Sequence, residues 1–134
     1  MRLRVIPTNV HSAVDHVVGP ALIAAPTVLG LDRTSPEGIV PRVNGIAAAL
    51  YSNLTDYELS LKNVIPMKLH LALDAMSGAA LAAVPFATGA RKRGAKHWAP
   101  HVALGAFEIG MAVLTKTQPP RSRTRRLARV LHLA

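Results

Sequence analysis

An internal repeat is the feature that most restricts how this 134-residue chain can fold. When the segment that starts at Val5 is aligned with the one that starts at Val64, nearly half of the following 26 or so positions are identical. The identical residues of the first copy are Val5, Ile6, Pro7, His11, Ala13, Asp15, Gly19, Ala21, Leu22, Ala24, Pro26 and Gly30. After one inserted residue, Gly45 corresponds to Gly105 and Thr55 to Thr115. The sequence therefore predicts two tandem units, at about 5–57 and 64–116, in a single domain that spans 1–134.

Each unit is expected to be a pair of helices. Proline suits the first turn of a helix, where its missing N–H group would have no partner, and glycine suits a helix end. These signals predict helices at about 7–29, 40–56, 66–88 and 98–116. We expect an all-α protein, a four-helix transmembrane bundle made of two tandem helical-hairpin repeats, with a basic C-terminal tail at 117–134.

A membrane location is favoured by long stretches without charge. No charged residue occurs in 17–31, 75–90 or 43–54, whereas a helix of a soluble bundle has a charged outer face. Runs of alanine and glycine in these stretches are typical of helices that pack closely in lipid. A soluble bundle is the alternative, because the uncharged stretches are short for single membrane spans.

The charge distribution predicts an orientation. The formal net charge is +9, and with four helices the side of the bundle that holds both termini carries more lysine and arginine. We therefore expect an integral protein of a bacterial cytoplasmic membrane with both termini in the cytoplasm. The opposite side contains Arg91, Lys92 and Arg93, which argues against this orientation.

The chain resembles the SPW-repeat membrane proteins, which are built of two-helix repeats with a proline-containing tripeptide near the end of the first helix. The matching residues are Asp15, Gly19, Pro26, Leu29 and Gly30 in the first unit and Asp74, Gly78, Pro85 and Gly89 in the second. The tripeptide itself differs, because it reads Ala-Pro-Thr at 25–27 and Val-Pro-Phe at 84–86. The resemblance implies a membrane location and no assigned activity.

A polar cluster is the one candidate site. His11 and Asp15 share a helix face because they are four residues apart, and His70 and Asp74 repeat this spacing. The two helices run in the same direction, so the pairs should lie at one depth, and Glu108 should reach a similar depth. Polar groups of this kind inside a membrane suggest function. We expect them first to pair with one another and join the two units. The alternatives are a site for a divalent metal such as zinc, iron or manganese, a proton relay or a ligand-binding cavity.

Other residues have simpler interpretations. His97 and His101 could chelate a metal, but we expect them to anchor the helix at the membrane interface. Arg42 and Asn44 are expected to form a helix-end pair. The tail is expected to bind an anionic lipid surface rather than nucleic acid, because it has no aromatic residue for stacking on bases. A disordered tail is an equal alternative. The arginines of that surface would be Arg121, Arg123, Arg125, Arg126 and Arg129.

The sequence contains no motif for an enzyme. The chain has no cysteine, so disulfides and thiolate metal sites are excluded, and no catalytic loop or nucleophile motif is present. We therefore expect a structural, accessory or interaction role without catalytic residues, most simply without a cofactor. The expected partners are the lipid bilayer and either further copies of the chain or another membrane protein. A metal- or proton-handling protein that uses the polar cluster is the alternative.

Overall fold

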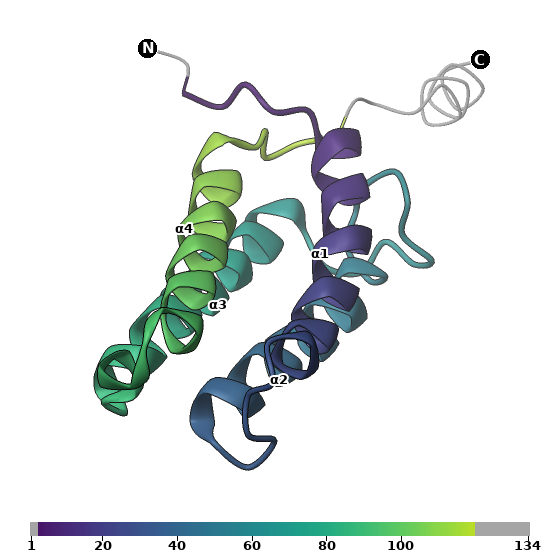
Figure 1. The fold of residues 1–134 in the computed structure, drawn as a ribbon. Coiled ribbons are helices and arrows are strands. Elements are labelled where there is room, and N and C mark those ends of the chain that lie inside the picture. Colours follow the sequence, from purple (N-terminus) through teal and green to yellow (C-terminus); the bar gives the residue numbers. More distant parts are fainter. Residues whose placement is uncertain (1–2, 120–134) are drawn as a thin grey trace, which may run out of the picture.

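The computed structural model describes residues 3–119 and is all-helical, as predicted (Figure 1). The tail arginines to which we assigned lipid binding lie outside the described residues. The helices are α1 (Thr8–Val28), α2 (Pro36–Ser52), α3 (Met67–Ala87) and α4 (Ala99–Leu114), and two short 3-10 turns at Ala90–Arg93 and Ala95–His97 precede α4. The part of the chain that the structure describes contains two isolated β-bridges and no strand.

Proline fixes where the two repeated helices begin. Pro7 and Pro66 both have extended ψ angles, and α1 and α3 begin at the next residue. The helix α2 begins at Pro36, earlier than the predicted start near residue 40, because Ser35 and Pro36 form its N-terminus. The prediction that Arg42 and Asn44 form a helix-end pair is therefore wrong. Arg42 bonds to the carbonyl of Gly38, and Asn44 donates across the bundle to Ser77.

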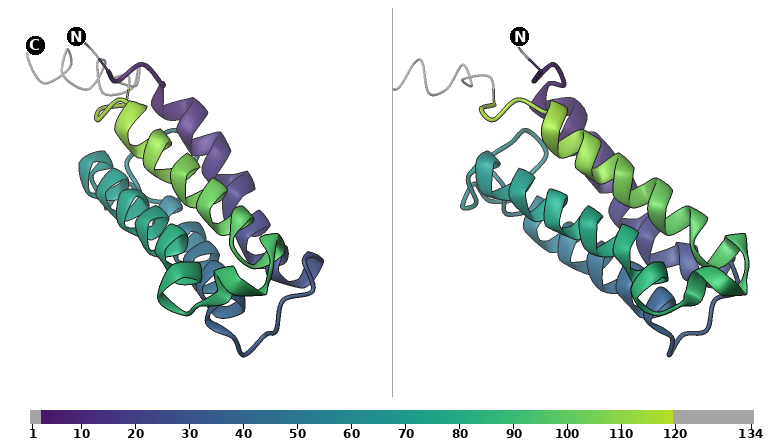
Figure 2. Two further views of the ribbon diagram at one scale, coloured as in Figure 1. Left: turned by 60° about the vertical axis from the view of Figure 1, so that its left-hand side comes forward. Right: turned by 90° about the vertical axis from the view of Figure 1, so that its left-hand side faces the viewer.

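The helices form two antiparallel hairpins, α1 with α2 and α3 with α4, and α2 also packs on α3 (Figure 2). Glycines allow the close approach within each hairpin. A Cβ atom at Gly45 would lie 2.6 Å from the carbonyl oxygen of Gly19, and one at Gly105 would collide with that of Gly78. These four glycines are equivalent in the two repeats, so both hairpins cross in the same way.

The two ends of the bundle differ in their connections. The end that we call the terminal end holds the starts of α1 and α3 and the ends of α2 and α4; the loop end holds the turns within each hairpin (Figure 1). At the terminal end each repeat reaches across to the other. Ile6 forms a β-bridge with Thr115, and Ile65 forms the equivalent bridge with Thr55. These bridges hold the segment before α1 beside the segment after α4, and the segment before α3 beside the segment after α2.

The buried interior contains many polar side chains beside apolar ones such as Leu22, Leu71 and Leu81, and many apolar side chains face outward. The fully or nearly buried side chains of the described residues include Thr8, His11, Ser12, Glu37, Ser52, Thr55, His70, Asp74, His101 and Thr115. Large apolar side chains on every helix are exposed, among them Val17, Leu50, Met76 and Phe107. By length and composition, α3 is the one described helix that could cross a membrane alone. The helices α2 and α4, with 17 and 16 residues, are each about 25 Å long.

Candidate metal centre

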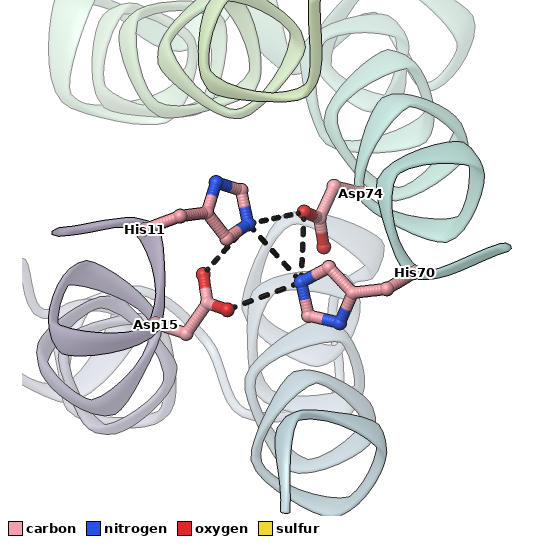
Figure 3. Close-up of side chains that lie close together, drawn as sticks. All are labelled: His11, Asp15, His70 and Asp74. Carbon is pink, nitrogen blue, oxygen red and sulfur yellow. Dashed lines mark hydrogen bonds and ion pairs between the residues drawn. The ribbon is translucent and has the colours of Figure 1, made fainter. Parts of the chain in front are cut away.

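Four of the five residues predicted to form a cluster meet at the terminal end. His11 and Asp15 project from α1 and His70 and Asp74 from α3, and the four side chains point toward one another (Figure 3). One nitrogen or oxygen atom from each lies within 4.8 Å of the others. The equal spacing of both pairs and the parallel course of α1 and α3 bring them to one depth, as the repeat predicts.

Every contact in this cluster is short. The Nε2 atom of His11 lies 3.0 Å from an oxygen of Asp74 and 3.4 Å from Asp15. The Nε2 atom of His70 lies 3.1 Å from Asp15 and 3.2 Å from Asp74. The two Nε2 atoms are 3.1 Å apart. Both imidazole rings therefore face one point with the same nitrogen, and each carboxylate contacts both rings.

The other nitrogen of each ring contacts a threonine. Nδ1 of His11 lies 2.8 Å from Oγ1 of Thr115, and Nδ1 of His70 lies 2.8 Å from Oγ1 of Thr55. Both threonines follow the last turn of a second helix and are fully buried. Sequence analysis aligned them as repeat equivalents but did not assign them to the site, because each lies in the repeat opposite to its histidine.

Two tyrosines donate hydrogen bonds to the carboxylates. The hydroxyl of Tyr51 lies 2.6 Å from Oδ1 of Asp74, and that of Tyr57 lies 3.0 Å from Oδ2 of Asp15. Their rings also contact the ring of His70, with centroids 5.0 and 5.3 Å apart. Burial, and then the charge of Asp15, raise the pKa of Tyr57, so its phenol stays protonated as a donor. These contacts could not be predicted from the sequence, because aromatic residues usually serve as packing or interfacial groups.

Glu108 is near the cluster but is not part of the group of close ligand atoms. It lines a cavity of about 20 Å³ together with His11, Asp15 and Asp74, which is room for about one water molecule. Its Oε2 atom is buried and has no hydrogen-bond partner among residues 3–119. The side-chain amide of Asn53, the residue that follows α2, donates to the carbonyl of Ala49.

The loop end holds a second, different group of polar side chains. Glu37 is completely buried and forms an ion pair with Arg93, and His97 lies 3.4 Å from the same oxygen. His101 is also buried, and its Nε2 atom lies 2.8 Å from the backbone oxygen of Glu37. The expectation that His101 anchors α4 at a membrane interface is therefore wrong. Glu37 was not singled out in the sequence, because it precedes the predicted helix start near residue 40, and a charged residue of a connecting segment is ordinarily exposed.

Comparison with known proteins supports the interpretation of the repeat. The model of the SPW repeat domain matches residues 9–115, so the chain belongs to the SPW-repeat family. This membership indicates a small membrane-associated protein and does not assign an activity. Neither the curated proteins nor the solved structures include a match. A role for the cluster must therefore be argued from its own chemistry.

Proposed function

We propose that this chain is a small integral membrane protein that binds one divalent transition-metal ion between its two repeats. The ligands would be His11, Asp15, His70 and Asp74. The observation that carries the proposal is the approach of two imidazole nitrogens and two carboxylates to a single point, from two helices that are far apart in the sequence.

The distances suit a bound ion. Two nitrogens that each lie about 2.0–2.1 Å from one metal ion are about 2.8–3.4 Å apart in octahedral to tetrahedral geometry. The two Nε2 atoms are 3.1 Å apart, so the rings already have the separation that a shared ion requires. Carboxylate oxygens lie at 3.0 to 3.4 Å from the same nitrogens and would complete the coordination.

The charge and type of the ligands favour a divalent ion. Two aspartates carry two negative charges, so a divalent ion makes the buried centre neutral, and a neutral centre has the smallest desolvation cost. Imidazole and carboxylate ligands without sulfur suit zinc, iron(II) or manganese(II) rather than copper(I). Lysine and arginine, which would repel a cation, are not among the residues that line the adjacent cavity.

The membrane part of the proposal is supported by the distribution of side chains. A soluble bundle buries its apolar residues and exposes its polar ones. Here the interior of the described chain contains histidine, aspartate, glutamate and threonine, and each helix exposes valine, isoleucine, leucine or phenylalanine. Lipid is the surrounding that makes this arrangement favourable. The lengths of α2 and α4 suit a bilayer that thins locally or helix ends that lie in the headgroup region.

A structural or accessory role is the second candidate, supported by the same contacts. If both imidazoles are protonated, each can donate to the carboxylates, and the cluster then joins the two hairpins through ion pairs without a metal. Such a centre would fix the register of α1 and α3. The chain would then act through its surface, as a homo-oligomer or as a partner of another membrane protein.

Metal analysis of the full chain, purified in detergent and incubated with zinc, separates these two candidates. We expect about one zinc ion per chain, measured by mass spectrometry of the elements after removal of free ions. The variant His11→Ala/His70→Ala should lose it, whereas His16→Ala, which changes an exposed histidine of the same helix, should keep it. A wild-type chain that is folded and holds no zinc, manganese or iron would contradict metal binding and favour the structural role.

The absence of cysteine allows a direct test of membrane insertion and orientation. Single cysteines can be introduced at exposed positions near opposite ends of the bundle, as Lys96→Cys and Gln118→Cys. With cytoplasmic termini, an impermeant maleimide added to intact bacterial cells should label Lys96→Cys, and Gln118→Cys should react after lysis alone. Complete extraction of the protein from membranes by alkaline carbonate would contradict integral insertion.

A further inference from the structure

The hydroxyl groups of Thr55 and Thr115 each donate their proton to a backbone carbonyl and not to a histidine. Oγ1 of Thr55 donates to the carbonyl of Tyr51 at 2.7 Å, and Oγ1 of Thr115 donates to the carbonyl of Met111 at 2.6 Å. A hydroxyl has one proton to donate. Toward the histidines, therefore, each threonine oxygen acts as an acceptor.

This assigns the position of a proton on each imidazole. Since the threonine oxygens accept at 2.8 Å, Nδ1 of His11 and Nδ1 of His70 must both carry hydrogen. In a neutral imidazole the second nitrogen then carries no hydrogen and has a free lone pair. That second nitrogen is Nε2, the atom that each ring directs at the centre of the cluster.

We propose that Thr55 and Thr115 are positioning residues that hold both histidines in the Nδ1–H form and so present two Nε2 lone pairs to the metal. The inference rests on the proposed metal-binding function and adds the residues that prepare its ligands. A ligating histidine whose other nitrogen donates to an oxygen is oriented and made more basic by that bond. Both threonines are fully buried, so water does not substitute for their hydroxyls.

The arrangement also makes the centre depend on both repeats. Thr115 of the second repeat orients His11 of the first, and Thr55 of the first orients His70 of the second. The β-bridges of Ile6 with Thr115 and of Ile65 with Thr55 place each threonine beside the start of the helix whose histidine it orients. Each repeat thus supplies two ligands and the group that orients one ligand of the other repeat.

The test compares Thr55→Val/Thr115→Val with Thr55→Ser/Thr115→Ser in the full chain. Valine preserves the shape of threonine and removes the hydroxyl, whereas serine keeps the hydroxyl. We expect the valine variant to bind zinc about 10- to 100-fold more weakly and the serine variant to bind within a few-fold of the wild type. Nitrogen-15 spectra of the histidine rings in the zinc-bound wild type should show a protonated Nδ1 and a coordinated Nε2 for both residues.

The outcomes separate this inference from the function on which it rests. If the wild type binds no metal, the proposed function fails. If the wild type binds zinc and the valine variant, folded by circular dichroism, binds equally well, metal binding stands and the positioning role is overturned. Ring spectra that show zinc on Nδ1 would overturn it as well. If the valine variant does not fold, the single variants Thr55→Val and Thr115→Val and the wild-type ring spectra decide the question in the same way.

Discussion

The terminal end and the loop end of the bundle both bury charged side chains, but only the terminal end does so symmetrically. At the terminal end each His–Asp pair has an equivalent in the other repeat, and both rings are bonded at both nitrogens. At the loop end Glu37 and His101 come from opposite repeats and are not equivalent. Within the described part of the chain, Oε2 of Glu37 and Nδ1 of His101 are buried without a hydrogen-bond partner. The two repeats are therefore alike where the two His–Asp pairs meet and differ in the buried charged groups near the turns of the hairpins.

The middle of the bundle separates these two regions. Leu22 and Leu81 are repeat equivalents, and both have no exposed surface. They lie on α1 and α3 between the polar terminal end and the loop end. Because such side chains exclude water and ions, the buried polar groups form two separate sites. This arrangement favours a bound ion at the terminal end over a continuous proton path through the molecule.

The largest loss of stability is expected at the glycines where the backbones of the two helices of a hairpin touch. Replacing Gly105 with valine should destabilise the fold by about 3 kcal/mol or more, because a Cβ there collides with the backbone of Gly78. Gly45→Val should act similarly in the other hairpin, since its Cβ would meet the backbone of Gly19. Thermal unfolding in detergent measures both. Gly110→Ala is the control, because nothing lies within 4 Å of its added Cβ, and it should be neutral or slightly stabilising.

Unequal effects of the two valines would show that the hairpins are not held in the same way. Suppose that Gly105→Val unfolds the chain and Gly45→Val leaves the melting temperature unchanged. The two hairpins would then not depend equally on close helix crossings, and such crossings could not explain why the two His–Asp pairs are placed symmetrically. The β-bridges of Ile6 with Thr115 and of Ile65 with Thr55 would then be the contacts that place the two pairs symmetrically.

A smaller effect is expected at the loop end. Arg93→Ala would leave the buried carboxylate of Glu37 without its arginine partner. We expect a loss of about 2 kcal/mol, below the range for fully buried pairs because the arginine side chain is half exposed. Arg91→Ala, which alters an exposed neighbour over the ring of Phe86, should change stability by less than about 0.5 kcal/mol.

A second substitution identifies the cause. Glu37→Gln removes the buried charge, so adding Arg93→Ala to it should cost much less than Arg93→Ala alone. Metal binding at the terminal end should stay within a few-fold of the wild type in all three variants. A large loss of zinc affinity in Arg93→Ala would contradict the separation of the two ends by Leu22 and Leu81.

The repeat allowed the convergence of the four polar side chains to be predicted from sequence because it supplies both spacing and direction. His11 and Asp15 share a helix face, and their copies lie on a parallel helix, so convergence followed without knowledge of any side-chain position. Glu37 could not be found in this way, because its burial depends on an ion pair with Arg93 across an irregular turn. The difference at the start of α2 has a local cause, since Ser35 and Pro36 form the helix N-terminus ahead of the predicted start near residue 40.

The residues around the two His–Asp pairs were harder to predict, because the repeat does not determine which residues they contact. Thr55 and Thr115 are equivalent, but their partners lie in the opposite repeat. Tyr51 and Tyr57 both belong to the first repeat, and the second has Met111 and Thr117 at the offset that pairs Thr55 with Thr115. Glu108 was predicted at the right depth, yet depth along α4 does not fix which way its carboxylate points.

The tyrosines give the smallest expected effect and test how far the symmetry of the terminal end extends. Tyr51→Phe removes a hydrogen bond of 2.6 Å to Asp74, and Tyr57→Phe removes one of 3.0 Å to Asp15. Asp15 also lies 3.4 Å from the hydroxyl of Ser52, so it keeps a donor when Tyr57 is changed. We expect Tyr51→Phe to cost about 1.5 kcal/mol and Tyr57→Phe about 0.5–1 kcal/mol of stability.

The same two variants measure whether the phenols influence the ion. Both should bind zinc within about tenfold of the wild type, because the four ligands remain and a phenol acts on a carboxylate only from outside. Titration with a competing chelator determines both affinities, and thermal unfolding in the same detergent determines both stabilities. A loss of zinc binding in Tyr51→Phe as complete as in His11→Ala/His70→Ala would mean that Tyr51 itself is a ligand. The centre would then draw its ligands unequally from the two repeats, and its two-fold symmetry would be limited to the histidines, aspartates and threonines.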